Sequence, residues 1–367
     1  MSDEKRRPRA AAPRQYAKGD MKEESRRQRR LQKLRRQRLQ NTIIMVFLLM
    51  SLAAGVLFLV YKLRGDTLRT LTVPYETADE FVEGSWSRSG ERAETFASEL
   101  CVADKSEIPM EGVALGDGQM GALLDLTEKE VRFAKGLYER VYPASITKLM
   151  TAILAIESGK LNDTVVIQQE DLDLESGSQV CGFLVGDKVT LNQLVHCLLV
   201  YSGNDAASAI ARYVGGSQTE FVAMMNQYAA EWGMTGTHFE NPHGLQSENH
   251  YTTTYDIYLM LNQAIQSKTF LEIAQLSDYT VNLEHADGTA GSITLASTDH
   301  YLTGEATPPK DVTVLGGKTG TTSDAGNCLA LVAQNAYGQP FISIVMNASS
   351  KEVLYQQMNT LLGQINS

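Results

Sequence analysis

Cysteine is scarce in this chain, and the common metal-binding spacings of cysteine and histidine are missing. Of 367 residues, 4 are cysteines, and no two of them form a Cys-Xaa-Xaa-Cys pair. A domain of this size does not need disulfide bonds for its stability. No His-Glu-Xaa-Xaa-His sequence occurs, which excludes that type of zinc site. The sequence fixes no pairing among Cys101, Cys181, Cys197 and Cys328, and the last two, which lie in apolar runs, are expected in the core.

Charge is distributed unevenly along the chain. Residues 1–40 hold 15 Lys or Arg and 5 Asp or Glu, a net charge of +10, so the remainder carries −20 to give the total of −10. Such asymmetry indicates contact with nucleic acid, a membrane surface or two compartments. The tail sequence RRQRRLQKLRRQRLQ is rich in arginine but poor in aromatic residues. We therefore favour a role in topology and lipid contact and expect no nucleic-acid partner, although such binding stays a minority alternative.

A long uncharged run follows the basic tail. From Thr42 to Tyr61 the chain reads TIIMVFLLMSLAAGVLFLVY, and at about 1.5 Å per residue it spans about 30 Å, enough to cross a bilayer as a single helix. The basic residues before it predict a cytoplasmic N-terminus and an extracytoplasmic main domain. A cleaved signal peptide fits less well, because the apolar run is too long. We predict a basic tail at 1–41, a transmembrane helix at 42–61, a stalk at 62–104 and a globular domain at 105–367.

The globular domain is predicted to have an α+β fold. GALLDLT and VRFAKGLYERVY are typical of a β-hairpin near its start, and VTVLGG, CLALVAQ and PFISIVMNA of three strands near its end. A final helix is expected in KEVLYQQMNTLLGQIN, and the segment between the two groups of strands is mostly helical. The sequence therefore predicts an antiparallel sheet built from both chain ends, with a helical subdomain inserted between them.

Helical spacing is clearest after Pro143. Thr190 and Gln193 form a capping-box pattern at the start of a later helix, and Asn204 or Asp205 is expected to cap the helix that follows. The apolar positions of the first helix repeat at intervals of three and four residues: Ile146, Leu149, Met150, Ile153 and Leu154.

Ser145 and Lys148 are the first candidate catalytic pair. They lie three residues apart in YPASITKLM, so a helix places both side chains on one face. In the first helical turn, unpaired N–H groups and the helix dipole favour a developing oxyanion at Ser145. Desolvation would lower the pKa of Lys148 toward that of a useful base, which a serine hydroxyl needs. The spacing alone is weak evidence, since Ser2 and Lys5 repeat it in the tail.

Two further motifs strengthen this prediction. YSGND places Ser202 and Asn204 between two expected helices, and GGKTGTT places Lys318 at the end of an expected strand. An ordinary helix cap or a hairpin end would explain either motif by itself. All three in this order, separated by 57 and 116 residues, are more consistent with segments that meet in one cleft.

In its motifs the chain resembles the low-molecular-mass penicillin-binding proteins, which are serine D-Ala-D-Ala carboxypeptidases of the peptidase S11 family. The resemblance covers about residues 105–365 and includes GDKVTLNQLVHCLLVYSGNDAA, MNQYAAEWGMTGTHFENPHGL, HYTTTYDI and GGKTGTTSDAGNCLAL. It implies a β-lactamase/transpeptidase-like fold. Residues 1–100 have no recognised counterpart, and no room is left after Ser367 for the β domain of many members. An N-terminal anchor is therefore expected in place of the usual C-terminal one.

The resemblance implies a catalytic role for three side chains. Ser145 would attack the carbonyl carbon of the penultimate D-Ala, and Lys148 would accept the proton of the serine hydroxyl. Ser202 would relay that proton to the nitrogen of the departing D-Ala. The implied substrate is the peptidoglycan stem peptide, β-lactam antibiotics would be covalent inhibitors, and no metal or cofactor is expected.

The resemblance also implies a substrate-binding set. Asn204 would bind the amide backbone of the substrate, and Lys318 with Thr319 would hold its terminal carboxylate. The stretch Lys318, Thr319, Gly320 and Thr321 forms one side of the site, and the N–H groups of Ser145 and Thr321 would form the oxyanion hole.

Three alternatives to this function stay open from the sequence. A β-lactamase-type hydrolase would share the acylation machinery and use an acid such as Glu240 to deacylate quickly. A zinc peptidase would need ligands such as His238, His243 and His250, whose spacings fit no common zinc site. A catalytically silent, wall-binding scaffold would keep the motifs without turnover. The sequence also leaves open a carboxypeptidase or an endopeptidase preference.

Overall fold

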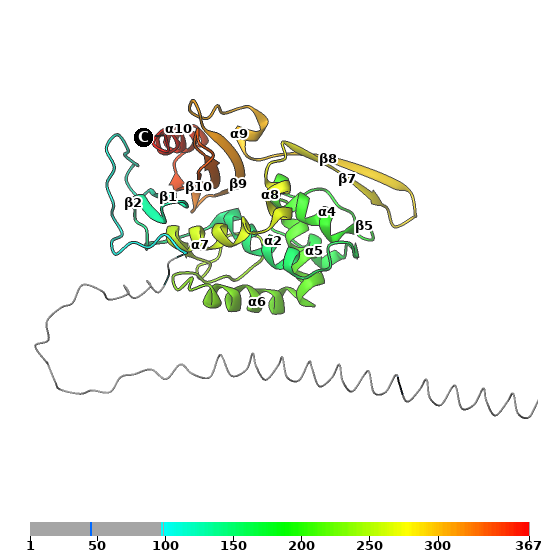
Figure 1. Cartoon of the computed structure of the whole chain (residues 1–367). Coiled ribbons are helices and arrows are strands. Elements are labelled where there is room, and N and C mark those ends of the chain that lie inside the picture. Colours follow the sequence, from blue (N-terminus) through cyan, green and yellow to red (C-terminus); the bar gives the residue numbers. More distant parts are fainter. Residues whose placement is uncertain (1–44, 46–96, 98, 367) are drawn as a thin grey trace, which may run out of the picture. The chain divides into compact units, whose positions relative to one another are not determined.

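The computed structural model describes residues 45, 97 and 99–366 (Figure 1). The predicted basic tail, nearly all of the Thr42 to Tyr61 helix and most of the predicted stalk lie outside the described residues. Among the residues that are described, no helix is both long and apolar enough to cross a membrane. From residue 97 onward the described chain belongs to one compact unit.

A five-stranded antiparallel sheet forms the centre of this unit, with the strand order β2-β1-β11-β10-β9. The first two strands come from the start of the domain and the other three from its end, which confirms the predicted arrangement. Its strands are β1 (Met120–Asp125), β2 (Glu130–Lys135), β9 (Thr313–Thr322), β10 (Gly326–Gln334) and β11 (Pro340–Ala348).

Helices cover both faces of this sheet. The C-terminal helix α10 (Lys351–Leu362) packs on β10 and β11 from one side, and α7 (Thr254–Ala264) packs on β1 and β11 from the other (Figure 1). Alternation along β10 matches this arrangement. Leu329 belongs to the cluster of α10, and the next residue, Ala330, belongs to the larger core on the opposite face.

The helical subdomain lies between β2 and β9 in the sequence. Its helical segments are η1 (Ala144–Thr147), α2 (Lys148–Glu157), α3 (Gln169–Leu172), α4 (Leu191–His196), η2 (Cys197–Tyr201), α5 (Asn204–Gly215), α6 (Gln218–Glu231), α7, α8 (Lys268–Ala274) and α9 (His300–Thr303). Two small antiparallel sheets accompany them: β3 (Arg140–Val141) with β6 (Thr252–Thr253), and β4 (Thr164–Val166), β5 (Lys188–Thr190), β7 (Asp278–Glu284) and β8 (Ala290–Ala296). The β7–β8 hairpin extends away from the helices in Figure 1.

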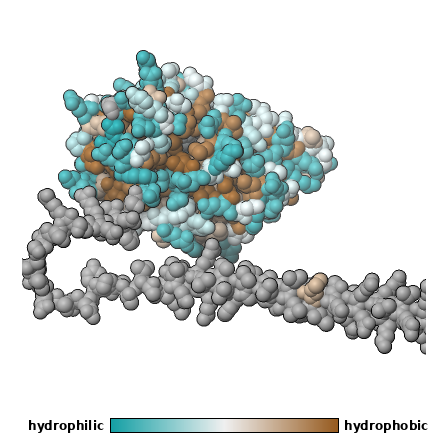
Figure 2. Space-filling model, in the orientation of Figure 1, coloured by the Kyte–Doolittle hydropathy of each residue, from teal (hydrophilic) through white to brown (hydrophobic). Residues whose placement is uncertain are grey.

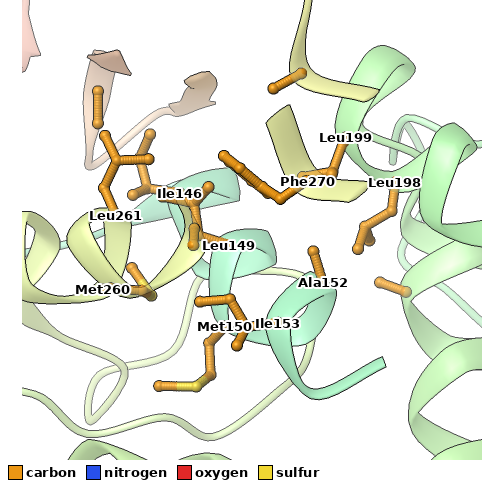
Figure 3. Close-up of a cluster of buried hydrophobic side chains, with 14 of the residues drawn as sticks. Ile146, Leu149, Met150, Ala152, Ile153, Leu198, Leu199, Met260, Leu261 and Phe270 are labelled. Carbon is orange, nitrogen blue, oxygen red and sulfur yellow. The ribbon is translucent and has the colours of Figure 1, made fainter. Parts of the chain in front are cut away.

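Helix α2 is embedded in the core. All of its residues from Lys148 to Ala155 are buried. Figure 3 shows its apolar side chains among Leu198 and Leu199 from η2 and Phe270 from α8. Helical periodicity therefore identified this buried face correctly. A helix packed on all sides holds any catalytic group it carries in a fixed position.

Two local details of the helices differ from or refine the prediction. The capping box of Thr190 and Gln193 is present. However, α5 begins at Asn204 after the N-cap Gly203, with no side-chain cap, so the prediction that Asn204 or Asp205 caps this helix was wrong. The carboxylate of Asp205 instead accepts a hydrogen bond from the N–H of Cys181 at 2.8 Å. A contact distant in sequence has replaced the local one.

All four cysteines are free and buried. Cys101, in the last part of the predicted stalk, is fully buried against the domain, where its N–H donates to the hydroxyl of Tyr258 at 2.8 Å. Figure 2 shows hydrophilic and hydrophobic residues mixed over the visible face of the domain.

Candidate active site

Ser145 stands on a tight turn between β3 and α2. The residue before it, Ala144, has a φ of 47°, which is uncommon for a residue with a Cβ atom and typical of strained functional turns. The loop that ends at Gly244 packs directly on this turn. A Cβ atom on Gly244 would lie 1.8 Å from the carbonyl oxygen of Ala144, so only glycine permits this approach. The close packing holds the turn in its strained conformation.

A buried histidine, His250, is hydrogen-bonded to the same turn through Thr147. The ring Nδ1 of His250 accepts a hydrogen bond from the N–H of Glu240 at 3.1 Å, so the proton lies on Nε2. Nε2 then donates to the hydroxyl of Thr147 at 2.8 Å, and that hydroxyl donates to the carbonyl of Ala144 at 2.8 Å. Burial lowers the pKa of His250 to about 4, so the imidazole is neutral at neutral pH. The donors and acceptors of this chain are therefore fixed, from the N–H of Glu240 through His250 and Thr147 to the carbonyl of Ala144.

Lys148 is fully buried, and its Nζ has three polar neighbours. The distances are 2.8 Å to Oγ of Ser145, 2.6 Å to Oδ1 of Asn204 and 2.6 Å to the carbonyl oxygen of His243. A neutral amine has two N–H groups and one lone pair. The two oxygens that can only accept take the two N–H groups, which leaves the lone pair for the hydroxyl of Ser145.

Electrostatics favour this neutral form. Burial in the protein interior is the largest cause that lowers the pKa of Lys148 well below its usual value, and the like charge of Lys318 lowers it further. The geometry and the charges therefore agree. Ser145 stands beside an amine that can accept its proton.

Ser202 lies at the end of η2 in a left-handed conformation, with a φ of 70°. The loop is packed tightly: a Cβ atom on the next residue, Gly203, would lie 2.2 Å from Sγ of Cys181. The N–H of Gly203 donates to the carbonyl of Cys197 at 3.3 Å. These contacts hold Ser202 in a conformation that few non-glycine residues adopt.

The third motif lies on β9, which passes directly by the turn of Ser145. A Cβ atom on Gly320 would be 3.1 Å from the backbone nitrogen of Ser145, so the strand and the turn touch at this point, one residue before Thr321. Lys318 is buried, and its Nζ donates to the carbonyl of Thr319 at 3.0 Å. Burial lowers the pKa of Lys318 to about 7, and the negative charge of Asp299 partly opposes this effect.

The three motifs meet at one cavity of about 390 Å³. Two predicted residues, Lys148 and Lys318, are buried and do not line the cavity themselves. Six of the predicted residues line the cavity: Ser145, Ser202, Asn204, Thr319, Gly320 and Thr321.

The cavity also includes residues that the sequence reasoning missed. Thr298, Lys351 and Tyr355 line it together with the predicted residues. Thr298 approaches the predicted site directly, because its hydroxyl is 2.6 Å from that of Thr319. None of the three belongs to a recognised motif, and only the folded chain brings them to the site.

The residues that a β-lactamase or a zinc peptidase would use either lie outside this cavity or are hydrogen-bonded to other groups. Glu240 is exposed, accepts a hydrogen bond from the hydroxyl of Ser247 and does not line the cavity. In the described part of the chain, no acidic side chain lines the cavity, and no group of three or more His, Cys, Asp or Glu residues is arranged to hold a metal.

The three histidines named for a zinc site contact separate groups. Nδ1 of His238 is 2.7 Å from the carbonyl of Asn249, and Nδ1 of His243 accepts from the N–H of Leu245 at 3.2 Å. His250 contacts Thr147, as described above.

Comparison with protein families gives a match over most of the domain. The peptidase S11 family, described as D-alanyl-D-alanine carboxypeptidase, matches residues 118–350. The chain is 29% identical over 251 residues to the D-alanyl-D-alanine carboxypeptidase DacF of Bacillus subtilis, which covers 67% of this chain and 61% of that protein. It is 32% identical over 257 residues to DacD of Salmonella typhimurium, which covers 67% and 62%. The chain thus spans about three fifths of the length of these relatives.

Solved structures share the fold. The crystal structure of the Streptomyces K15 DD-transpeptidase matches with a TM-score of 0.61 and 26% identity, over 66% of this chain and 94% of that chain. The D-alanyl-D-alanine carboxypeptidase DacD from Francisella tularensis matches in fold with a TM-score of 0.60 and 24% identity, over 71% and 73%. The predicted penicillin-binding, β-lactamase-like α+β fold of the domain is thereby confirmed.

Proposed function

The chain belongs to the peptidase S11 family, and from this premise we propose that it is a serine DD-carboxypeptidase that removes the terminal D-Ala from peptidoglycan stem peptides. One observation carries the proposal. The amine of Lys148 lies 2.8 Å from the hydroxyl of Ser145 at the wall of a cavity that Asn204 and the β9 motif also line. A nucleophile, its base and polar groups for a peptide are thus available at one place.

Acylation begins at Ser145. Its Oγ attacks the carbonyl carbon of the penultimate D-Ala while Lys148 takes the hydroxyl proton, so Lys148 becomes positively charged and the carbonyl oxygen becomes the oxyanion. The oxyanion is stabilised by the N–H groups of Ser145 and Thr321, at about 3 kcal/mol per donor. Ser202 then relays this proton: its hydroxyl donates to the departing nitrogen and takes the proton held by Lys148, so the C–N bond breaks, D-Ala leaves and Lys148 is again neutral. Water hydrolyses the resulting ester and restores the free serine.

Substrate binding uses the other side of the cavity. The amide of Asn204 binds the peptide backbone of the substrate, and its oxygen also fixes Lys148 at 2.6 Å. Lys318 and Thr319 bind the terminal carboxylate, a charge-assisted contact that selects peptides with a free C-terminus. Gly320 lets β9 pack directly on the turn of Ser145, so the strand that binds the substrate lies beside the nucleophile.

We propose an extracytoplasmic location for this reaction. The support is the uncharged run from Thr42 to Tyr61 and the basic residues before it, which favour a single-pass anchor with a cytoplasmic N-terminus. The domain then faces the peptidoglycan. β-Lactam antibiotics would acylate Ser145 and act as covalent inhibitors.

The absence of an acid from the described lining of the cavity favours a peptidase over a β-lactamase. Rapid hydrolysis of a penicillin adduct needs a general base for water, and Glu240 is exposed outside the cavity. The adduct is therefore expected to last for minutes or longer. An adduct that turns over rapidly would support the β-lactamase alternative.

The proposal is tested with the full-length protein and a peptide that ends in D-Ala-D-Ala. We expect the wild type to release D-Ala and the Lys148→Ala variant to release almost none, because its serine has no base. Intact protein that binds a penicillin but releases no D-Ala would contradict the proposed activity. In cells, a Ser145→Ala variant that behaves as the wild type in a cell-wall assay would support a scaffold instead.

A further inference from the structure

Asp299 is a buried acid that the mechanism above does not use. It is 4% exposed and precedes the short helix α9. Its Oδ1 accepts hydrogen bonds from the N–H of Tyr301 at 3.0 Å and from the hydroxyl of Tyr355 at 3.4 Å. Its Oδ2 has no hydrogen-bond partner among the described residues. Such an oxygen is costly to bury, so its environment requires an explanation.

The chain around Asp299 is fixed against the active site. The N–H of Thr298 donates to the carbonyl of Val200 at 3.1 Å, two residues before Ser202. The hydroxyl of Thr298 is 2.6 Å from that of Thr319. Helix α9 also packs on β9, the strand that carries Lys318. Asp299 is therefore held beside the segment that binds the substrate carboxylate.

Lys318 lacks a nearby counter-charge in direct contact. Its ammonium donates to the carbonyl of Thr319, and in the part of the chain that the structure describes no ion pair within 4.0 Å joins it to Asp299. The two charges still act on each other. Burial lowers the pKa of Lys318, and the carboxylate of Asp299 opposes this effect. Burial raises the pKa of Asp299, and the hydrogen bonds from Tyr301 and Tyr355 and the charges of His300 and Lys318 partly oppose that rise.

The other titratable groups around this pair do not supply the missing negative charge. Lys148 on α2 carries no negative charge, and the charge of Lys318 lowers its pKa. The ring of His300 stacks on that of Tyr355, with the centroids 4.7 Å apart, and its Nε2 lies 3.5 Å from the carboxylate of Glu305. Burial raises the pKa values of the hydroxyls of Tyr355 and Tyr301, so both are neutral.

We propose that Asp299 is a positioning residue, a buried counter-charge that keeps Lys318 protonated and ready for the terminal carboxylate of the substrate. The absence of a direct ion pair between them suits this role, because such a pair would compete with the substrate for the ammonium group. The inference rests on the proposed function, since it assigns a task within the same site.

The proposal predicts a specific change in the pH profile. Activity requires a neutral Lys148, which sets the acid limb, and a charged Lys318, which sets the alkaline limb. An opposite charge nearby typically changes a pKa by about one to three units. Without the carboxylate of Asp299, Lys318 loses its proton at lower pH, so the alkaline limb of the profile moves to lower pH.

The experiment measures kcat/KM for a D-Ala-D-Ala peptide between about pH 5 and pH 10, with full-length wild type and Asp299→Asn. We expect the alkaline limb of the variant to move down by about one unit or more, with about tenfold lower kcat/KM at alkaline pH. The loss should be in KM, with kcat near the wild-type value on the acid side. Asp299→Ser, which keeps a helix cap but not the charge, should give the same shift.

Tyr301→Phe provides the matched control. It removes a partly buried hydroxyl that donates to Asn359 but keeps the carboxylate of Asp299 and the backbone N–H that donates to it, so its alkaline limb should coincide with that of the wild type. An unchanged limb in both Asp299 variants, or an equal loss of activity at every pH, would overturn the proposal. The rate of acylation by benzylpenicillin, which also carries a carboxylate, gives the same test. If the wild type releases no D-Ala, the proposed function fails, while this second profile still decides the role of Asp299.

Discussion

Replacing Asn204 by Asp tests the state of the catalytic lysine. The two side chains have nearly the same shape, but Asp places a carboxylate oxygen where Oδ1 of Asn204 now lies, 2.6 Å from Nζ of Lys148. A negative charge at this distance favours the ammonium form. The pKa of Lys148 therefore rises, and at neutral pH less of the enzyme holds a base that can accept the proton of Ser145.

The size of the effect follows from the contact distance and the burial. Two unit charges about 4 Å apart interact with about 4 kcal/mol at an effective dielectric constant of about 20. This corresponds to about three pKa units, at the top of the usual range of one to three units for such a pair. On the acid limb, each unit lowers the fraction of neutral lysine, and hence kcat/KM, about tenfold.

The assay is the pH profile of D-Ala release by the wild type, Asn204→Asp and Asn204→Ala. We expect Asn204→Asp to move the acid limb to higher pH and to recover activity as the pH rises. Asn204→Ala removes the amide without adding charge, so its loss should be similar at all pH values. The reasoning is refuted if Asn204→Asp keeps the wild-type profile or loses activity uniformly, as the Ala variant does.

Three further changes test the support of the site. His250 has a pKa of about 4 in the fold and an ordinary value of 6.5, so the unfolded state binds more protons between these values, and stability falls as the pH falls from 6.5 to 4. Between pH 6.5 and pH 4 the free energy of unfolding should therefore fall by about 3 kcal/mol less in His250→Gln than in the wild type, as measured by denaturant unfolding. The same pH dependence in both proteins would contradict a buried neutral imidazole. Gly244→Ala should displace the turn at Ala144, because the new Cβ would lie 1.8 Å from the carbonyl oxygen of Ala144. We expect acylation to slow at least tenfold and the free energy of unfolding to fall by about 1 to 3 kcal/mol. A wild-type acylation rate would show that the turn does not need this contact. Asp171→Ala should cost about 3 to 5 kcal/mol, because it removes the buried partner of Arg212 at 2.8 Å and leaves it with the more exposed Glu170, at 3.6 Å. A loss below 1 kcal/mol would refute a stabilising buried ion pair.

Periodicity and motif order predicted much of the fold and the site. The alternation in CLALVAQ gave β10, and the helical spacing after Pro143 gave α2 with its buried face. The three motifs were expected in one cleft because of their order, and they do meet at one cavity. These features depend on local sequence and on chemistry that needs several groups together.

Features that depend on distant contacts could not be predicted in this way. The second acceptor of Lys148 is the carbonyl of His243, 95 residues away. The strained φ of Ala144 depends on the loop of Gly244. Asn204 was expected to be a helix cap, but Lys148 takes its side-chain oxygen. A backbone carbonyl has no sequence signature, because every residue type has one. A buried counter-charge has none either, because only the fold brings the acidic residue close to its partner.

The most direct measurement is the site and rate of acylation of the full-length protein by benzylpenicillin, followed by mass spectrometry and peptide mapping. We predict one adduct, on Ser145, that is absent from Ser145→Ala and forms far more slowly in Lys148→Ala. An adduct on another residue, or acylation of Ser145 at an undiminished rate without the lysine, would contradict the assignment of this pair.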